Sequence, residues 1–269
     1  MVYIYEIEEE SMGNFISELL QYRFLIHELV IRDIKKKYRR SVLGVVWSIL
    51  NPLLMMTVTA MVFSTIFRFS VENYPLYLLI GQIMFTLYAE STNFAMSSII
   101  ENGSLIKKVY IPKYLFPLSR VISSCVNFLF TLPALIIIIL VTGQPIHWQM
   151  LSFLIPLILF AFFCLGVGLF LATFAVYFRD VFHLYGVLLS LLNYATPIFY
   201  PEEIVPQKYL WLQQMNPLYY FCKAFREALY SGVIPDGMLL FQCVILAVVA
   251  MGIGVTVFRR KQNHFILYV

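Results

Sequence analysis

Long uncharged stretches alternate with short charged segments along this chain. The first stretch runs from Ser41 to Phe67 and contains no Asp, Glu, Lys or Arg. At roughly 1.5 Å of rise per helical residue, a run of this length exceeds the ~30 Å hydrocarbon thickness of a bilayer. Similar stretches follow, and the pattern predicts an all-α polytopic membrane protein with six transmembrane helices. We expect the spans at about residues 42–67, 75–99, 118–141, 151–176, 181–200 and 237–258.

Basic residues set the orientation predicted for these spans. Six of the nine residues from Arg32 to Arg40 are Lys or Arg, and cationic flanks stay on the cytoplasmic side. The first span therefore leaves the cytoplasm at Ser41, and Arg259-Arg260-Lys261 returns the chain to the inside after the last span. Residues 1–10 hold four glutamates and no basic residue, which does not fit a secretory signal. We expect both termini in the cytoplasm.

Two segments outside the spans are expected to be helical as well. Residues 14–40 predict an amphipathic helix in the cytoplasmic interface, because apolar residues recur there largely in steps of four. The stretch 201–236 is rich in aromatic residues but too polar to cross. It predicts one or two short re-entrant or gate helices at the outer face, broken at Pro206 and at Asn216-Pro217. The apolar residues of the first segment are Phe15, Leu19, Tyr22, Ile26, Val30, Ile34 and Tyr38.

Composition supports a membrane protein and excludes several other classes. The chain is 61% hydrophobic and 13% charged, which leaves too little polar surface for a soluble protein of 269 residues. A net charge of +4 comes largely from residues beside the spans, so we expect no nucleic-acid binding. The four cysteines lie far apart and no metal-binding or catalytic motif occurs. Residues 1–269 are therefore predicted to form one transmembrane domain without a cofactor or metal of its own.

A few residues within the predicted spans are candidates for a transport path. Glu90 interrupts the second span, and an ionised carboxylate inside a membrane costs about 2.5–3.5 kcal/mol unless a partner or water reaches it. A functional and a structural role are both open for this residue. The aromatic residues Tyr194, Phe199 and Tyr200 end the fifth span and could stack on sugar rings, although core packing is the commoner use. In the fourth span, Gly166 and Gly168 would let neighbouring helices approach closely.

An ordered set of short motifs resembles the permease subunits of ABC exporters that carry polysaccharides and teichoic acids across bacterial inner membranes. Each motif alone is weak, but together they span nearly the whole chain in the expected order. The first group of motifs lies before and within the first span. The other groups lie in the predicted cytoplasmic loop after the second span, in the turn between the fourth and fifth spans, at the end of the fifth span and in the stretch 201–236. They are Arg32-Asp33, Tyr38, Ser41, Leu43-Gly44, Trp47 and Asn51-Pro52; Asn102 to Lys108 with Pro112; Tyr177 to Asp180; Thr196 to Pro201; and Asn216-Pro217 with Arg226.

This resemblance implies a homodimer of six-span permeases in the bacterial cytoplasmic membrane. A separate nucleotide-binding subunit would hold ATP and Mg, and the substrate would be a polymer on an undecaprenyl-phosphate type of lipid. Asn216, Pro217 and Arg226 would belong to helices that gate the outer mouth. The residues expected to contact the ATPase are Arg32, Asp33, Tyr38, Asn102, Gly103, Leu105, Ile106, Lys107, Lys108 and Pro112.

Two other functions remain open at this point. A membrane-embedded enzyme acting on lipid-linked sugars would have similar spans, but it should gather carboxylates or histidines at one membrane face. A small-molecule exporter of the same superfamily often has a large outer domain between its first two spans, whereas the connection here is short. The motifs are shared by exporters of O-antigen, capsule, wall glycan and teichoic acid, so they do not identify the polymer.

Overall fold

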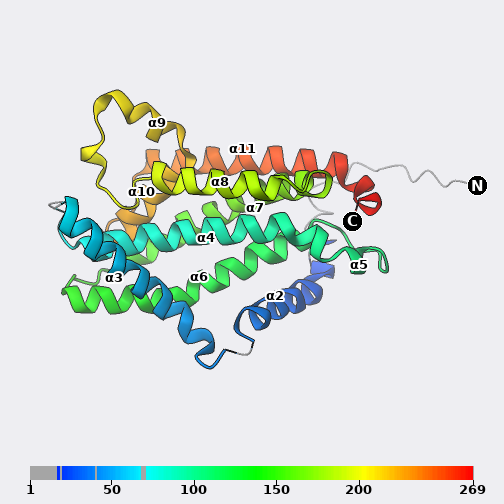
Figure 1. Cartoon of the computed structure of the whole chain (residues 1–269), viewed down its shortest axis with the longest axis horizontal. Helices are drawn as coiled ribbons and strands as arrows, with labels where there is room; N and C mark the ends of the chain where they lie inside the picture. Colours follow the sequence, from blue (N-terminus) through cyan, green and yellow to red (C-terminus); the bar gives the residue numbers. More distant parts are fainter. Residues whose placement is uncertain (1–16, 19, 40, 68–70, 269) are drawn as a thin grey trace, which may run out of the picture.

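The computed structural model describes residues 17–18, 20–39, 41–67 and 71–268. Residues 1–10 and 14–16, for which we predicted a cytoplasmic end and the start of the interface helix, lie outside the described residues. Within the described part, the chain folds into helices and turns without a strand. The long helices lie alongside one another, and α3 crosses the others diagonally (Figure 1). These helices are α3 (Trp47–Phe67), α4 (Tyr74–Glu101), α6 (Leu115–Thr142), α7 (Leu154–Tyr177), α8 (Val181–Ala195) and α11 (Gly237–Lys261).

Shorter helices lie at the two ends of the bundle. α2 (Arg23–Tyr38) and α5 (Gly103–Ile106) lie toward the end where α11 finishes, and α9 (Leu210–Met215) lies at the opposite end (Figure 1). α10 (Pro217–Leu229) follows α9 after the break predicted at Asn216-Pro217. Asn216 accepts a hydrogen bond from the backbone nitrogen of Leu218 at 3.0 Å, which caps the new helix, and Pro217 fits its first turn.

Four segments of the described chain are long and apolar enough to cross a membrane by length and composition. They are Gly44–Phe63, Leu115–Thr142, Trp148–Tyr177 and Gly237–Leu267. These segments correspond to the first, third, fourth and sixth predicted spans. α4 has 28 residues, which is sufficient length, but it carries more polar side chains than these four segments.

The helix predicted for the fifth span is too long. α8 ends at Ala195, and residues 196–200 form bends instead of continuing the helix to Tyr200. Thr196 takes an extended conformation with ψ of 135°, as expected for a residue that precedes proline. Pro197 therefore ends the helix although the following residues are still apolar.

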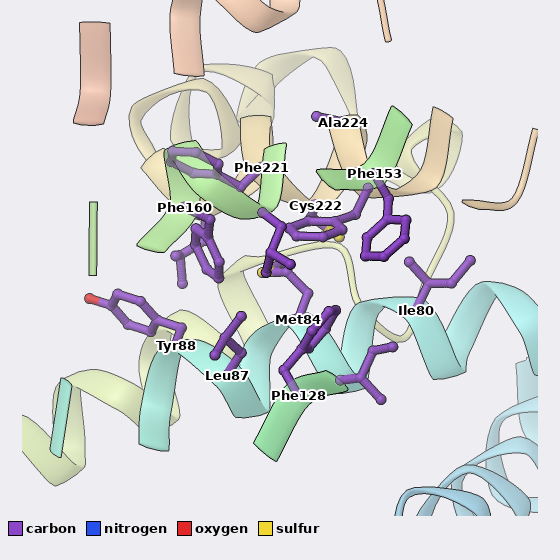
Figure 2. Packing of buried hydrophobic residues seen from close by; sticks show 14 of the residues in the cluster. Ile80, Met84, Leu87, Tyr88, Phe128, Phe153, Phe160, Phe221, Cys222 and Ala224 are labelled. Atoms are coloured by element: carbon purple, nitrogen blue, oxygen red, sulfur yellow. The ribbon is translucent and has the colours of Figure 1, made fainter. Parts of the chain in front are cut away.

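The core lies between α4, α6, α7 and α10. Phe221 of α10 packs on Phe160 and Phe163 of α7, with ring centroids 4.8 and 5.2 Å apart. Phe160 in turn faces the α4 side chains Met84 and Leu87 (Figure 2). Such aromatic pairs contribute about 0.5–1.5 kcal/mol each beyond their buried area. α4 is the central helix, since it contacts α3, α6, α7 and α10.

Small residues allow the closest helix contacts, as predicted for Gly166 and Gly168. A β-carbon at Gly168 would lie 2.6 Å from that of Ala95 in α4, and one at Gly166 would lie 2.4 Å from the α11 backbone at Ala250. No side chain fits at either contact. Packing of backbone on backbone is the usual means of helix association where lipid replaces water.

Candidate functional site

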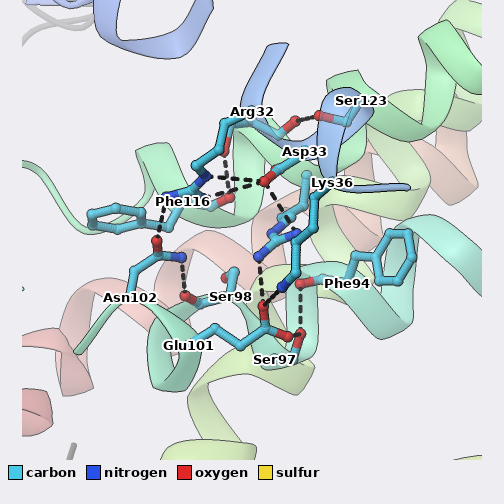
Figure 3. A network of polar contacts seen from close by, with 12 residues as sticks. Arg32, Asp33, Lys36, Phe94, Ser97, Ser98, Glu101, Asn102, Phe116 and Ser123 are labelled. Atoms are coloured by element: carbon cyan, nitrogen blue, oxygen red, sulfur yellow. Dashed lines mark hydrogen bonds and ion pairs between the residues drawn. The ribbon is translucent and has the colours of Figure 1, made fainter. Parts of the chain in front are cut away.

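A group of polar side chains joins α2 to α4 and α6 at the end of the bundle near α5 (Figure 3). The sequence brings them from three separate segments: the end of α2, the end of α4 and the second turn of α6. We call this group the charged cluster. Its members are Arg32, Asp33, Lys36, Glu101, Asn102 and Arg120.

Arg120 is the central residue of the charged cluster. Its Nη1 lies 3.3 Å from Asp33 Oδ1, and its Nη2 lies 2.7 Å from Glu101 Oε2. The side chains of Arg120 and Asp33 are only 8% and 5% exposed. A buried charge is tolerated only when it is paired, so these contacts fix α2 against α4 and α6.

Arg32 and Lys36 complete the cluster at its exposed side. Arg32 Nη1 donates a hydrogen bond to Asn102 Oδ1 at 3.0 Å, and Asn102 Nδ2 donates to the carbonyl of Ser98 at 2.7 Å. Lys36 Nζ lies 3.5 Å from Glu101 Oε2. Two of the predicted ATPase-contact residues, Arg32 and Asn102, are thus bonded to each other.

The pKa of Glu101 is set by its burial and by the polar and charged groups around it. Burial raises the pKa of the carboxyl, but the hydrogen bond from Ser97 and the charges of Arg120 and Lys36 outweigh that effect. The pKa of Glu101 consequently lies below its ordinary value, and the carboxylate stays ionised in the cluster.

A second set of contacts joins α2 to the bundle further from its end. Lys37 forms an ion pair with Glu90, whose side chain is 24% exposed. The Tyr38 hydroxyl contacts Ser48 Oγ and donates to Asn127 Oδ1 of α6 at 3.3 Å. Glu90 therefore has the partner that an intramembrane carboxylate needs, and it lies with the α2 contacts and not beside the predicted aromatic path residues.

Most of the exposed residues of the segment 102–112 lie at its tip, residues 107–110. Gly103 and Ile106 are buried, and Ile106 packs in a cluster with Leu29, Phe116 and Phe265. Leu105 and Pro112 are half-buried. The exposed residues are Ser104 and, at the tip, Lys107, Lys108, Val109 and Tyr110.

At the opposite end of the bundle, side chains of α4 and α10 hold the non-helical segment 196–200. The Tyr74 hydroxyl donates to the carbonyl of Phe199 at 2.6 Å, and the Tyr77 hydroxyl donates to that of Tyr200 at 3.0 Å. Arg226 Nη2 donates to the carbonyl of Ile198 at 3.2 Å. We call Tyr74, Tyr77, Asn216 and Arg226 the outer clamp.

The outer clamp gives two of the predicted gate residues defined contacts. The guanidinium of Arg226 stacks over the Tyr77 ring at 3.5 Å from its centroid, a cation–π contact strengthened where water is excluded. Asn216 Nδ2 donates to Thr196 Oγ1 at 2.8 Å. Backbone carbonyls freed from a helix need partners of this kind in a membrane, so the clamp stabilises the interruption after α8.

The three aromatic residues predicted to line a path have different surroundings. Tyr194 is 67% exposed on α8. Phe199 is half-buried and stacks on Phe63 of α3, with centroids 5.3 Å apart. Tyr200 donates its hydroxyl to the carbonyl of Tyr194 at 3.0 Å. Of the three, Tyr194 is the most exposed, although its ring lies 6.0 Å from that of Phe199.

Sequence reasoning missed several residues of these two sites. Arg120 stands at the start of the third predicted span, and a lone charge at the edge of an apolar run is a signal for a buried partner. Tyr74 and Tyr77 occur among many aromatic residues, and nothing in the sequence distinguishes them. Val109 and Tyr110 lie next to the predicted Lys107 and Lys108, but outside the motif of Asn102 to Lys108 with Pro112 from which the contact residues were taken.

The fold and these sites define a multi-pass membrane protein that lacks a group of three or more metal-ligating side chains among its described residues. Residues 25–230 match the ABC-2 type transporter family, and the chain belongs to that family. The earlier resemblance is confirmed. Proteins of this family are permease subunits, and the ATPase is a separate subunit, so the chain is a transport protein and not itself an enzyme.

The chain is similar to several curated permeases over most of its length. It is 28% identical to the O-antigen export system permease protein RfbA of Myxococcus xanthus over 94% of this chain and 98% of that protein. It is 32% identical to RfbA of Klebsiella pneumoniae over 87% of this chain and 90% of that protein. The polysialic acid transport protein KpsM of Escherichia coli is 22% identical over 88% of this chain and 93% of that protein.

Proposed function

We propose that this chain is the channel-forming permease of an ABC exporter for a lipid-linked cell-surface polymer. The polymer would be an O-antigen, a capsular or wall polysaccharide or a teichoic acid, crossing the bacterial cytoplasmic membrane on an undecaprenyl-type lipid. The observation that carries this proposal is the similarity to O-antigen export permeases over 94% of the chain and 98% of one such protein. A match of that extent leaves no room for an additional soluble domain of another function within the aligned part.

The proposed topology has six spans with both termini in the cytoplasm. α4 and α8 add two spans to the four apolar segments. α4 has the length, at about 1.5 Å per residue over 28 residues, and three of its polar side chains, Ser91, Thr92 and Ser98, are buried in the bundle. α8 has 15 residues, and the segment 196–200 continues the crossing with its carbonyls bonded by the outer clamp. The basic ends of α2 and α11 support a cytoplasmic position for the charged cluster.

Coupling to ATP would begin at the tip of the segment 102–112. Lys107, Lys108, Val109 and Tyr110 are exposed there, and the partner ATPase would bind them together with the basic face of α2. ATP and Mg stay on the partner subunit. When ATP closes the ATPase pair, the push on the tip reaches α2 and α6 through the charged cluster, because Asn102 begins this segment and Glu101 directly precedes it. The ATPase then shifts the permease only as far as it binds one conformation more tightly than the other.

Two protomers would form the channel between them. α3 and α8 are the least buried of the long helices, and both present apolar side chains on the surface of the protomer. Movement of α3 and α8 relative to a second copy would open a continuous path. The exposed ring of Tyr194 would then be available to stack on sugar units of the polymer.

The test is purification of the chain with its candidate ATPase through a tag on the ATPase alone, followed by reconstitution in lipid vesicles. We expect a complex of two permeases and two ATPases that moves a lipid-linked glycan only when ATP is supplied. A folded chain that is not recovered with the tagged ATPase, or a complex that hydrolyses ATP but moves no glycan of any class, would contradict the proposal.

A further inference from the structure

α8 is attached to the rest of the protomer by few side chains. Only Tyr185 and Leu189 are buried among its 15 residues. Large apolar side chains on the remaining surface are exposed, among them Leu184, Val187 and Leu191. By contrast, 17 residues of α4 are buried. The packing energy that holds α8 in place is therefore small relative to that of its neighbours.

Tyr185, in the second turn of α8, forms hydrogen bonds to the core, one of them with the Tyr88 hydroxyl of α4. The Tyr185 hydroxyl donates to Thr92 Oγ1 of α4 at 2.6 Å, and both side chains are almost completely buried. Thr92 Oγ1 donates in turn to the carbonyl of Tyr88 at 2.6 Å. Tyr88 itself lies in the aromatic core beside Phe160 (Figure 2). The chain of bonds thus joins α8 to the central helix of the bundle.

The surroundings make this bond specific for one position of α8. Apolar packing varies gradually as a helix slides, whereas a hydroxyl pair is either bonded or not. In a dry interior the Tyr185 hydroxyl finds no water when the pair separates, so the separated state carries the cost of a buried donor without its acceptor, whereas Thr92 keeps its bond to the Tyr88 carbonyl. The bond therefore favours the position seen here over displaced positions of α8.

We propose that the Tyr185 hydroxyl is a positioning group for transport: it latches α8 to Thr92 in the resting state, and the latch opens when α8 moves. This inference rests on the proposed export function, in which α8 moves during the ATP cycle. The outer clamp holds the segment after α8, so release at Tyr185 lets the first half of α8 move while its other end stays attached. Neutral hydrogen bonds suit such a latch because the net contribution of each to stability is small enough to be overcome in each cycle.

Four single variants and one double variant test the latch in the purified permease–ATPase complex. Tyr185→Phe and Thr92→Val remove the bond with little change of shape, and each should raise the rate of ATP hydrolysis without substrate by about two- to tenfold, the ratio that one such bond is worth. Thr92→Ser keeps the hydroxyl and should retain the original rate. Ser190→Ala removes an exposed hydroxyl from the same helix, one that bonds only to the carbonyl of Gly186 in that helix, and should change nothing. The double variant Tyr185→Phe/Thr92→Val should match Tyr185→Phe, because the tyrosine hydroxyl is absent from both.

Several results would overturn the latch. These are an unchanged rate for Tyr185→Phe, equal rates for Thr92→Ser and Thr92→Val, or a double variant in which the two effects multiply. A purely structural role for Tyr185 would lower the yield of folded complex without raising hydrolysis per complex.

A second measurement separates the latch from the proposed function. Amide hydrogen exchange in residues 181–195 of the purified permease alone should be faster in Tyr185→Phe than in Ser190→Ala. This experiment needs neither ATP nor a substrate. If the complex shows no ATP-driven transport, the proposed function fails, but a difference in hydrogen exchange would still support the latch. Equal exchange in the two variants would refute the latch and leave the proposed function untouched.

Discussion

Gly166 of α7 and Gly254 of α11 face each other so closely that a β-carbon at residue 254 would lie 2.1 Å from the carbonyl oxygen of Gly166. The space at Gly166 is equally tight, because a β-carbon there would lie 2.4 Å from the α11 backbone at Ala250 and Met251. Both obstacles are main-chain atoms, which cannot rotate away as a side chain can. The crossing of α7 and α11 therefore requires glycine at both positions.

Alanine at either glycine should weaken the bundle. We expect Gly166→Ala or Gly254→Ala to cost about 1–3 kcal/mol or more, since the two backbones must separate to admit one methyl group. The measurement is thermal unfolding of the purified chain in detergent. Gly252→Ala is the matched control on α11, because a β-carbon there meets nothing within 4 Å. Equal unfolding temperatures for Gly254→Ala and Gly252→Ala would show that the crossing is looser than described.

Loss of Arg120 should detach α2 from the bundle. Arg120→Met leaves Asp33 buried without its α6 partner, and breaking a buried ion pair at one side costs up to about 3–5 kcal/mol. Arg32 also reaches Asp33, at 3.2 Å, and reduces that cost. Hydrogen exchange in α2 should rise strongly in Arg120→Met, and a second substitution, Asp33→Asn, should restore part of the protection.

Lys36→Met provides the control for the charged cluster. Lys36 also pairs with Glu101, but its side chain is 71% exposed, and exposed pairs contribute about 0–1 kcal/mol. An Arg120→Met variant that behaves like Lys36→Met would mean that burial of the pair contributes nothing to the attachment of α2.

Acidification should weaken the same contacts. Because the pKa of Glu101 in the folded protein lies below its ordinary value of 4.5, ionised Glu101 contributes stability at pH values above the ordinary pKa. That contribution is lost as the pH falls through the lowered pKa. Protection of α2 against exchange should decrease in this acidic range, and Glu101→Gln should lack this part of the pH dependence. A full pH dependence in Glu101→Gln would assign the effect to another carboxyl group.

Most spans could be predicted because hydrocarbon thickness sets the length of an uncharged helix. The predicted spans 118–141 and 151–176 lie in two of the four segments that are long and apolar enough to cross a membrane. The helix of the fifth span was predicted to run to residue 200 because residues 196–200 are as apolar as the helix before them. Proline at 197 carried the correct information, since the residue before a proline disfavours helical geometry. The prediction of the helix end gave more weight to hydrophobicity than to the effect of proline on the residue before it.

The site was harder to predict because its contacts join distant parts of the chain. Arg32 and Asn102 were named separately, but hydrophobic periodicity cannot show that they bond across seventy positions. Ile106 was expected at a partner surface, and its side chain is instead buried against α2 and α6 residues. A four-residue helix is too short for periodicity to define which face is buried.

The exposed tip of the segment 102–112 gives the sharpest test of ATPase docking. Reversing both charges with Lys107→Glu/Lys108→Glu should abolish recovery of the permease with a tagged ATPase, because the proposed contact would then carry the opposite charge. The fold should be retained, since both side chains are exposed. Thermal unfolding of the permease alone should stay unchanged. Lys208→Glu, an exposed lysine in the outer segment, is the matched control and should leave recovery intact. Ile106→Asp is unsuitable, since it would place a charge in the core and lower stability whether or not an ATPase binds there. If the Lys107→Glu/Lys108→Glu variant still assembles fully, docking must depend on α2, and the proposed route of coupling would begin at its basic face.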